Sequence, residues 1–128
     1  MILLTPDLRE RLLTNGQQPD VDHIPVVKFF NPLGAGVWLA TELDADGDTL
    51  FGLADLGEPE LGSFSLGEIA AVRLPLGLGI ERDLLFEGMV PISVWADAAR
   101  KAGGIREEER MLYTARRARS QDGWGAST

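Results

Sequence analysis

The sequence predicts an α+β domain: a small, mostly antiparallel sheet of four to five strands, with an N-terminal helix and one or two C-terminal helices packed on it. Apolar residues recur at helical spacing near the start and toward the end of the chain, whereas the middle holds short runs rich in β-branched and aromatic residues. The turns between these runs are short. Because parallel strands need connections of about a dozen residues or more, we expect antiparallel pairing.

The first helix is predicted to begin after Thr5, a suitable N-cap that is followed by proline at the first helical position. Leu4, Leu8 and Leu12 recur every four residues and therefore lie on one helical face. Gly16 favours the left-handed conformation that commonly ends a helix. We expect this helix to cover one side of the core.

Strands are predicted at residues 26–31, 36–43 and 50–56. The last two are joined by the acid-rich turn 44–49, whose Asp and Gly residues suit a hairpin. In the first strand of this hairpin, Leu39 and Leu43 share one face, and Glu42 lies on the other face with Trp38. Because both faces carry apolar residues, the hairpin is expected to be central, with an element packed on each side.

The remaining elements are a loop at 57–62, a short strand at 61–66, a short helix to about residue 72, a loop at 73–79, a strand at 84–87, a helix at 93–102, a second C-terminal helix at 105–120 and a frayed end at 121–128. The short helix is predicted from the capping box that Ser65 and Glu68 form. Trp95 and Ala99 give helix 93–102 an apolar face. We therefore predict one α+β domain over residues 1–104 and a helical extension with a frayed tail over residues 105–128.

Composition narrows the class of protein. The chain has 128 residues, enough for one hydrophobic core, and 45% of them are hydrophobic. It has no cysteine, which excludes disulfides, thiolate metal sites and cysteine catalysis. No apolar run approaches the length of a membrane span or a signal-peptide core, so a cytoplasmic protein without a membrane anchor is expected.

Charge is distributed unevenly along the chain. The net charge is -8, which argues against direct, non-specific binding of nucleic acid. No Lys or Arg occurs between Lys28 and Arg73, although eight acids fall there: Glu42, Asp44, Asp46, Asp48, Asp55, Glu58, Glu60 and Glu68. Residues 105–128 contain five arginines against four acids. The protein thus combines an acidic body with a mildly basic end.

Five short strings in the middle of the chain together are specific for one protein family: FFNP, WLATELD, FGLADLG, PELG and GLGIERD. Over residues 3–104 the chain resembles a family of small bacterial proteins of uncharacterised function, often encoded on plasmids and other mobile elements. The resemblance implies that the gene for this protein lies on a plasmid or another mobile element. It implies no activity, and no catalytic residue can be carried over from it.

The hairpin turn invites comparison with a calcium loop, because Asp44, Asp46 and Asp48 alternate there. An EF-hand loop needs glycine at its sixth position and glutamate at its twelfth. Counted from Asp44, these positions hold Thr49 and Asp55. An acidic hairpin turn is therefore predicted, and no metal site.

Glycine motifs occur at residues 34–36 and 77–79, but neither has the lysine of a phosphate-binding loop. Both are predicted to be tight turns, and no cofactor is expected. His23, the single histidine, is expected to be solvated in a polar loop.

Charged residues that break the local pattern are the candidate site: the cluster Glu81-Arg82-Asp83, which follows the 73–79 loop, and Glu42 in the middle of a strand. One interpretation is structural, with Arg82 reaching Glu42 or Asp55 in a partly buried pair. The other is catalytic. Arg82 would then bind an anionic group, and a carboxylate from Glu42, Glu60, Glu81 or Asp83 would act as general acid or base.

Two functional hypotheses follow. The leading one is a non-enzymatic accessory or interaction protein of a mobile element, which binds a protein partner through its acidic surface and, in a narrower form, mimics DNA. The alternative is a carboxylate-based hydrolase or phosphate-ester-processing enzyme with its site around Glu42 and Glu81-Arg82-Asp83. The oligomeric state is open, because a helix at 105–119 could also pair between chains.

Overall fold

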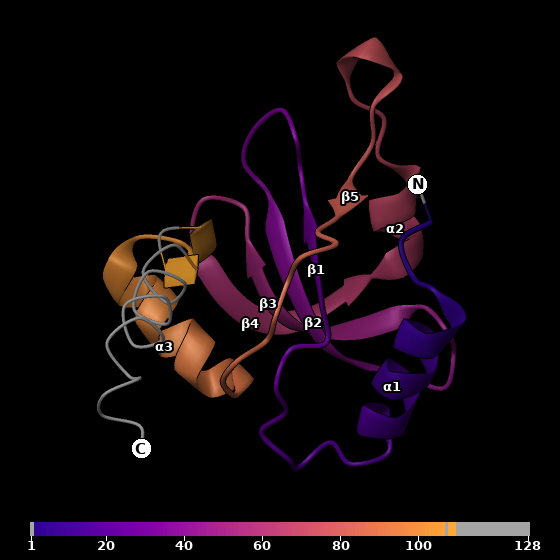
Figure 1. The fold of residues 1–128 in the computed structure, drawn as a ribbon, viewed down its shortest axis with the longest axis vertical. Helices are drawn as coiled ribbons and strands as arrows, with labels where there is room; N and C mark the ends of the chain where they lie inside the picture. The colour runs from indigo at the N-terminus through magenta and orange to yellow at the C-terminus, as the bar shows by residue number, and fades with distance from the viewer. Residues whose placement is uncertain (1, 107, 110–128) are drawn as a thin grey trace, which may run out of the picture.

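A computed structural model describes residues 2–106, 108 and 109 and confirms the α+β class (Figure 1). Its five-stranded sheet is antiparallel throughout, in the order β4-β3-β2-β1-β5. The strands are β1 (Val27–Phe30), β2 (Val37–Leu43), β3 (Thr49–Asp55), β4 (Pro59–Ser65) and β5 (Glu81–Arg82). The helices are α1 (Pro6–Gly16), α2 (Leu66–Ala71) and α3 (Ile92–Ala102), with a short 3-10 turn, η1, at Pro75–Gly77.

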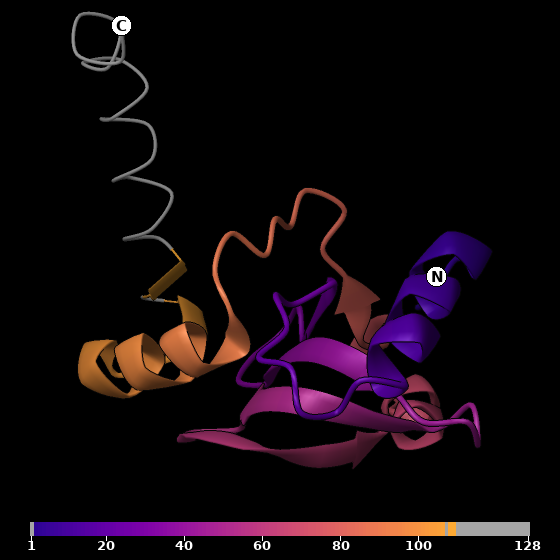
Figure 2. The same ribbon diagram turned by 90° about the horizontal axis from the view of Figure 1, so that it is seen from below.

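The sheet carries a hydrophobic core on each face, because successive side chains in a strand point to opposite sides. On the face that α1 covers, Phe29 and Ala40 pack with Leu12 of the helix. On the face that α3 covers, Leu39 packs with Trp95. Figures 1 and 2 show the two helices on opposite sides of the sheet. The prediction that the β2–β3 hairpin is central and covered on both faces is confirmed.

The predicted face of Glu42 is wrong, because β2 contains a bulge. The register steps from Ala40 opposite Gly52 to Glu42 opposite Phe51, so Thr41 is an extra residue. One extra residue inverts the side-chain alternation beyond it. Glu42 therefore lies on the α3 face and not with Ala40 on the α1 face.

Two predicted strand positions also need correction. β4 begins at Pro59, within the predicted loop 57–62. Residues 84–87 are not a strand: the carboxylate of Asp83 accepts a hydrogen bond from Leu85 N at 2.9 Å and turns the chain there. The fifth strand is instead Glu81–Arg82, which pairs with the end of β1.

The hairpin aspartates have structural roles. The Asp46 carboxylate accepts hydrogen bonds from the Thr49 hydroxyl at 2.6 Å and from the backbone N–H groups of Asp48 and Thr49, both at 2.8 Å. These bonds, led by that from the hydroxyl, lower the pKa of Asp46. Asp48 accepts from the Ser65 hydroxyl and from Gly67 N, and so fixes the start of α2. The acids predicted to form a turn do so.

The end of α3 leads directly back to the sheet. Gly103 ends the helix in the left-handed conformation, with φ of 93°. Ile105 is fully buried, and its N–H donates to the Asp55 carboxylate at 3.0 Å. The rest of the predicted extension, at residue 107 and from residue 110 on, lies outside the described residues. No helix in the described ranges has the length and apolar character needed to cross a membrane.

Candidate functional site

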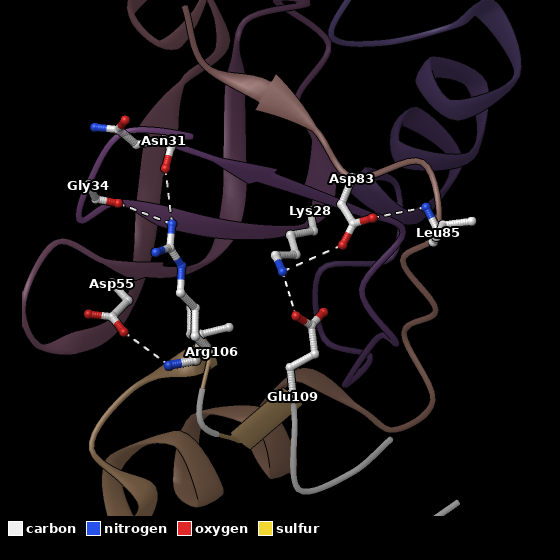
Figure 3. A network of polar contacts seen from close by, with 9 residues as sticks. Lys28, Asn31, Gly34, Asp55, Asp83, Leu85, Arg106 and Glu109 are labelled. Atoms are coloured by element: carbon white, nitrogen blue, oxygen red, sulfur yellow. Dashed lines mark hydrogen bonds and ion pairs between the residues drawn. The ribbon is translucent and has the colours of Figure 1, made fainter. Parts of the chain in front are cut away.

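A cavity of about 750 Å³ opens on the α3 face where β1 meets β5. Figure 3 shows the polar contacts of Lys28, Asp83, Arg106 and Glu109, which are part of its wall. Its wall is made by Lys28, Phe30, Asn31, Pro32, Glu81, Arg82, Asp83, Leu84, Leu85, Arg106 and Glu109. We call it the Lys28 pocket. It contains three basic and three acidic residues, so its formal charge is balanced. Leu84 and Leu85 form an exposed apolar rim.

The alternation of β5 places the predicted cluster around this pocket. Glu81 is paired with Phe30 and therefore lies on the α3 face. Asp83 lies there too, and its N–H donates to Lys28 O at 3.0 Å. Arg82, between them, belongs to the opposite face.

Arg82 holds the N-terminal segment. Its Nη1 donates to Ile2 O at 2.9 Å and to Leu3 O at 3.1 Å. The predicted pair with Glu42 or Asp55 is therefore wrong, because the strand alternation points Arg82 toward the chain that precedes α1. Asp55 accepts hydrogen bonds from Gly57 N and Ile105 N instead.

Lys28 is the central group of the pocket, and the sequence prediction missed it. Its side chain is only 9% exposed, and its Nζ lies 2.5 Å from Glu109 Oε1 and 3.5 Å from Asp83 Oδ2. The ammonium also lies 5.8 Å from the centre of the Phe30 ring. A buried charge needs such partners. A signal was present, since Lys28 is the single charge in the apolar run at residues 26–30.

Arg106 closes the other side of the pocket. Its Nη2 donates to Asn31 O at 3.0 Å and to Gly34 O at 3.1 Å, across the turn between β1 and β2. Lys28, Arg82 and Arg106 thus each bind oxygens of a segment distant in sequence. The pocket's cations tie the N-terminal segment, the β1–β2 turn and the chain after α3 to the edge of the sheet.

Glu42 does not line the Lys28 pocket, so three of the four predicted site residues come together and one does not. Glu42 is 9% exposed and accepts a hydrogen bond from the Thr41 hydroxyl at 3.3 Å. Burial raises the pKa of Glu42, and the nearby His23 opposes this shift. Glu60, the other carboxylate considered, is exposed on β4.

His23 is buried, with 8% of its surface exposed, which corrects the expectation of a solvated ring. Its Nε2 lies 2.8 Å from Gln18 O, so the ring has a hydrogen-bond partner in its own loop. Among the residues that the structure describes, no group of three or more His, Cys, Asp or Glu side chains could hold a metal ion.

Replacing Glu42 by glutamine tests the burial of this carboxylate. Because its folded-state pKa is raised, the folded protein binds this proton more tightly than the unfolded chain does. The free energy of unfolding therefore falls as pH rises from the ordinary pKa of 4.5 through the raised value. We expect Glu42→Gln to unfold at higher urea concentration than the wild type at neutral pH, with the difference vanishing below the ordinary pKa.

Glu60→Gln is the control, since its side chain is exposed and should change stability little at either pH. A Glu42→Gln variant that is less stable than the wild type at neutral pH would show that the carboxylate is stabilising there. Burial also raises the pKa of Glu108, but this group is present in both proteins and cancels in the comparison.

The family model described as "Protein of unknown function (DUF2958)" matches residues 3–106. The chain belongs to this family. The DUF2958 match spans α1, every strand of the sheet, α3 and Arg106, and it confirms the resemblance to a family of uncharacterised function. No curated protein and no solved structure matches the chain.

Proposed function

We propose that this DUF2958 protein is a non-enzymatic interaction protein that binds a basic protein partner through an acidic surface. The observation that carries the proposal concerns the eight acids in the sequence between Lys28 and Arg73: half of them are bound or buried within the fold, and the other half are exposed. Asp46, Asp48 and Asp55 bind backbone or hydroxyl groups within the fold, and Glu42 is buried. Four others are exposed, and none of their side chains has a hydrogen bond or ion pair to another described residue: Asp44, Glu58, Glu60 and Glu68.

These four carboxylates, which we call the exposed acid set, lie in a span without a single Lys or Arg. The span itself supplies no cation to offset their field, and such a field favours encounter with a basic surface. Arg9 of α1 reaches the turn that holds Asp44, where its Nη1 donates to Gly47 O at 3.5 Å. In the narrower form of the proposal, the partner's surface is a nucleic-acid-binding site, which the protein occupies by mimicking DNA. The protein would then be an accessory protein of a mobile element.

A matched pair of variants tests the proposal. The first neutralises the exposed acid set: Asp44→Asn, Glu58→Gln, Glu60→Gln and Glu68→Gln. The second removes the same number of charges from exposed acids outside that span: Asp7→Asn, Glu10→Gln, Asp20→Asn and Asp97→Asn. Each protein is immobilised and exposed to lysate of the native host at low and at high salt.

We expect a basic protein to bind the wild type and the second variant at low salt, to be released by high salt, and to be lost with the first variant. Equal retention by both variants would contradict a role for the exposed acid set. Release of the partner by added duplex DNA is the result expected of DNA mimicry, and insensitivity to DNA would exclude that narrower form.

A second candidate is favoured by the Lys28 pocket alone: a hydrolase that uses Glu81 or Asp83. The cavity volume falls within the usual range of ligand sites, about 300–1,000 Å³. Against it, Lys28 already binds Asp83 and Glu109, so these carboxylates serve as its counter-ions. Turnover of p-nitrophenyl phosphate that falls about a hundredfold in Glu81→Gln would favour this candidate; absence of turnover would oppose it.

A further inference from the structure

Strand β4, which carries Glu60 of the exposed acid set, lies at one margin of the sheet, and within the described part of the chain no strand pairs with its outer side (Figure 2). We propose that β4 receives an extended basic segment of the partner as a sixth strand of the sheet. This inference rests on the proposed function and adds to it the shape of the partner and the atoms that recognise it.

The register shows which backbone groups of β4 are available. In an antiparallel ladder the residues of every second pair exchange hydrogen bonds. Leu66 N donates to Asp48 O at 2.9 Å, which fixes the phase of the β3–β4 ladder. The pairs in the same phase are Glu60 with Ala54, Gly62 with Gly52 and Phe64 with Leu50. The N–H and C=O groups of Leu61 and Ser63 consequently point away from the sheet.

The residues of β3 that bond to β2 alternate with those that bond to β4, which agrees with this assignment. Asp44 N donates to Thr49 O at 2.9 Å, so Thr49 directs its carbonyl toward β2 and not toward β4. Pro59, the first residue of β4, has no N–H, and it belongs to the outward phase where none is needed. No backbone hydrogen bond joins Leu61 or Ser63 to another segment within the described residues.

Natural sheets protect their edges with very short strands, bulges, charged side chains, proline or covering segments. The other edge of this sheet follows that rule, because β5 has only two residues. In contrast, β4 pairs with β3 without interruption over seven residues. Its protecting residues are Pro59, at the first position of the strand, and Glu60, whose negative charge disfavours an acidic strand and favours a basic one. An edge of this kind is a template for another strand.

The side chains of β4 select the chemistry of the incoming strand. Glu60 and Gly62 belong to the α1 face, and a Cβ built on Gly62 meets nothing within 4 Å, so long cationic side chains have room beside Glu60. On the α3 face Leu61 is 39% exposed and offers an apolar contact. A strand with Lys or Arg at alternate positions and apolar residues between them satisfies both faces at once.

The probe is an acetylated and amidated peptide of about eight residues with alternating lysine and valine. Binding to the full chain is measured by fluorescence anisotropy of the labelled peptide. Ser63→Pro and Leu61→Pro each remove one outward N–H and leave the ladder to β3 intact, so both should fold as the wild type does, as circular dichroism can verify. Ser63→Ala is the matched control, because it removes the hydroxyl and keeps the N–H.

We expect the peptide to bind the wild type and Ser63→Ala, and each proline variant to lose about tenfold or more in affinity. The same peptide with N-methylated valines should not bind, since it keeps its charge but lacks half of its donors. Binding that survives both proline substitutions but falls with Glu58→Gln and Glu60→Gln would overturn strand addition and leave the acidic-surface proposal standing. No binding to the wild type would also overturn the inference.

Discussion

Replacing Gly52 by alanine is expected to lower the free energy of unfolding by about 3 kcal/mol or more, the upper end for an over-packed core. A Cβ at this position would lie 1.8 Å from Leu39 O and 3.0 Å from the Cα of Ala40. Both are backbone atoms of the neighbouring strand β2, so no side-chain rotation can relieve the contact. The two central strands would have to separate or shift at the bulge.

Gly62→Ala is the matched control for this prediction. Gly62 is paired with Gly52 across the β3–β4 ladder, yet an added Cβ there meets nothing within 4 Å. Its stability should stay within about 1 kcal/mol of the wild type, since it adds a methyl group in open space. Urea denaturation of both variants measures the difference. Equal midpoints for the two alanine variants would show that the β2–β3 contact is not as close as the structure has it.

Replacing Lys28 by methionine is the second change with a large expected effect, a loss of about 3 kcal/mol. Methionine fills a similar volume but leaves the Glu109 carboxylate, 12% exposed, and the Asp83 carboxylate, 26% exposed, without their shared cation. The two acids would then face each other in a partly buried site. The cost arises mainly from these uncompensated charges.

The triple variant Lys28→Met, Asp83→Asn, Glu109→Gln separates that cause from packing. Removing the carboxylates should restore a large part of the lost stability in a thermal or urea unfolding experiment. Lys101→Met serves as the surface control, because Lys101 and Asp97 are 77% and 69% exposed and their pair should contribute little. If the triple variant were no more stable than Lys28→Met, the loss would come from packing and not from unpaired charge.

The elements predicted best are those that depend on neighbouring residues. The α1 helix begins after Thr5, whose hydroxyl accepts from Leu8 N at 3.2 Å. Ser65 caps α2 as its spacing to Glu68 predicts. Asp46 closes the hairpin within its own turn. In each case the donor and acceptor are three residues apart, so a short stretch of sequence contains both partners.

The candidate site was predicted only in part, because its members come from distant segments. The charges of Glu81-Arg82-Asp83 interrupt an apolar pattern, which makes the run a candidate site in the sequence, and the structure places all three residues in the wall of the Lys28 pocket. Glu109 was missed because it reaches Lys28 across a separation of 81 residues. Arg106 likewise meets Asn31 only after α3 has folded over the sheet.

By itself, the sequence determined the α+β class, the central hairpin and the division into an acidic body and a more basic end, since periodicity, turn chemistry and charge are local properties. Only the tertiary structure decided which way Glu42 and Arg82 point. One extra residue in β2 moves Glu42 to the α3 face, and a two-residue strand directs Arg82 to the N-terminal segment. A single step in register inverts every side chain beyond it, and that step depends on the partner strand.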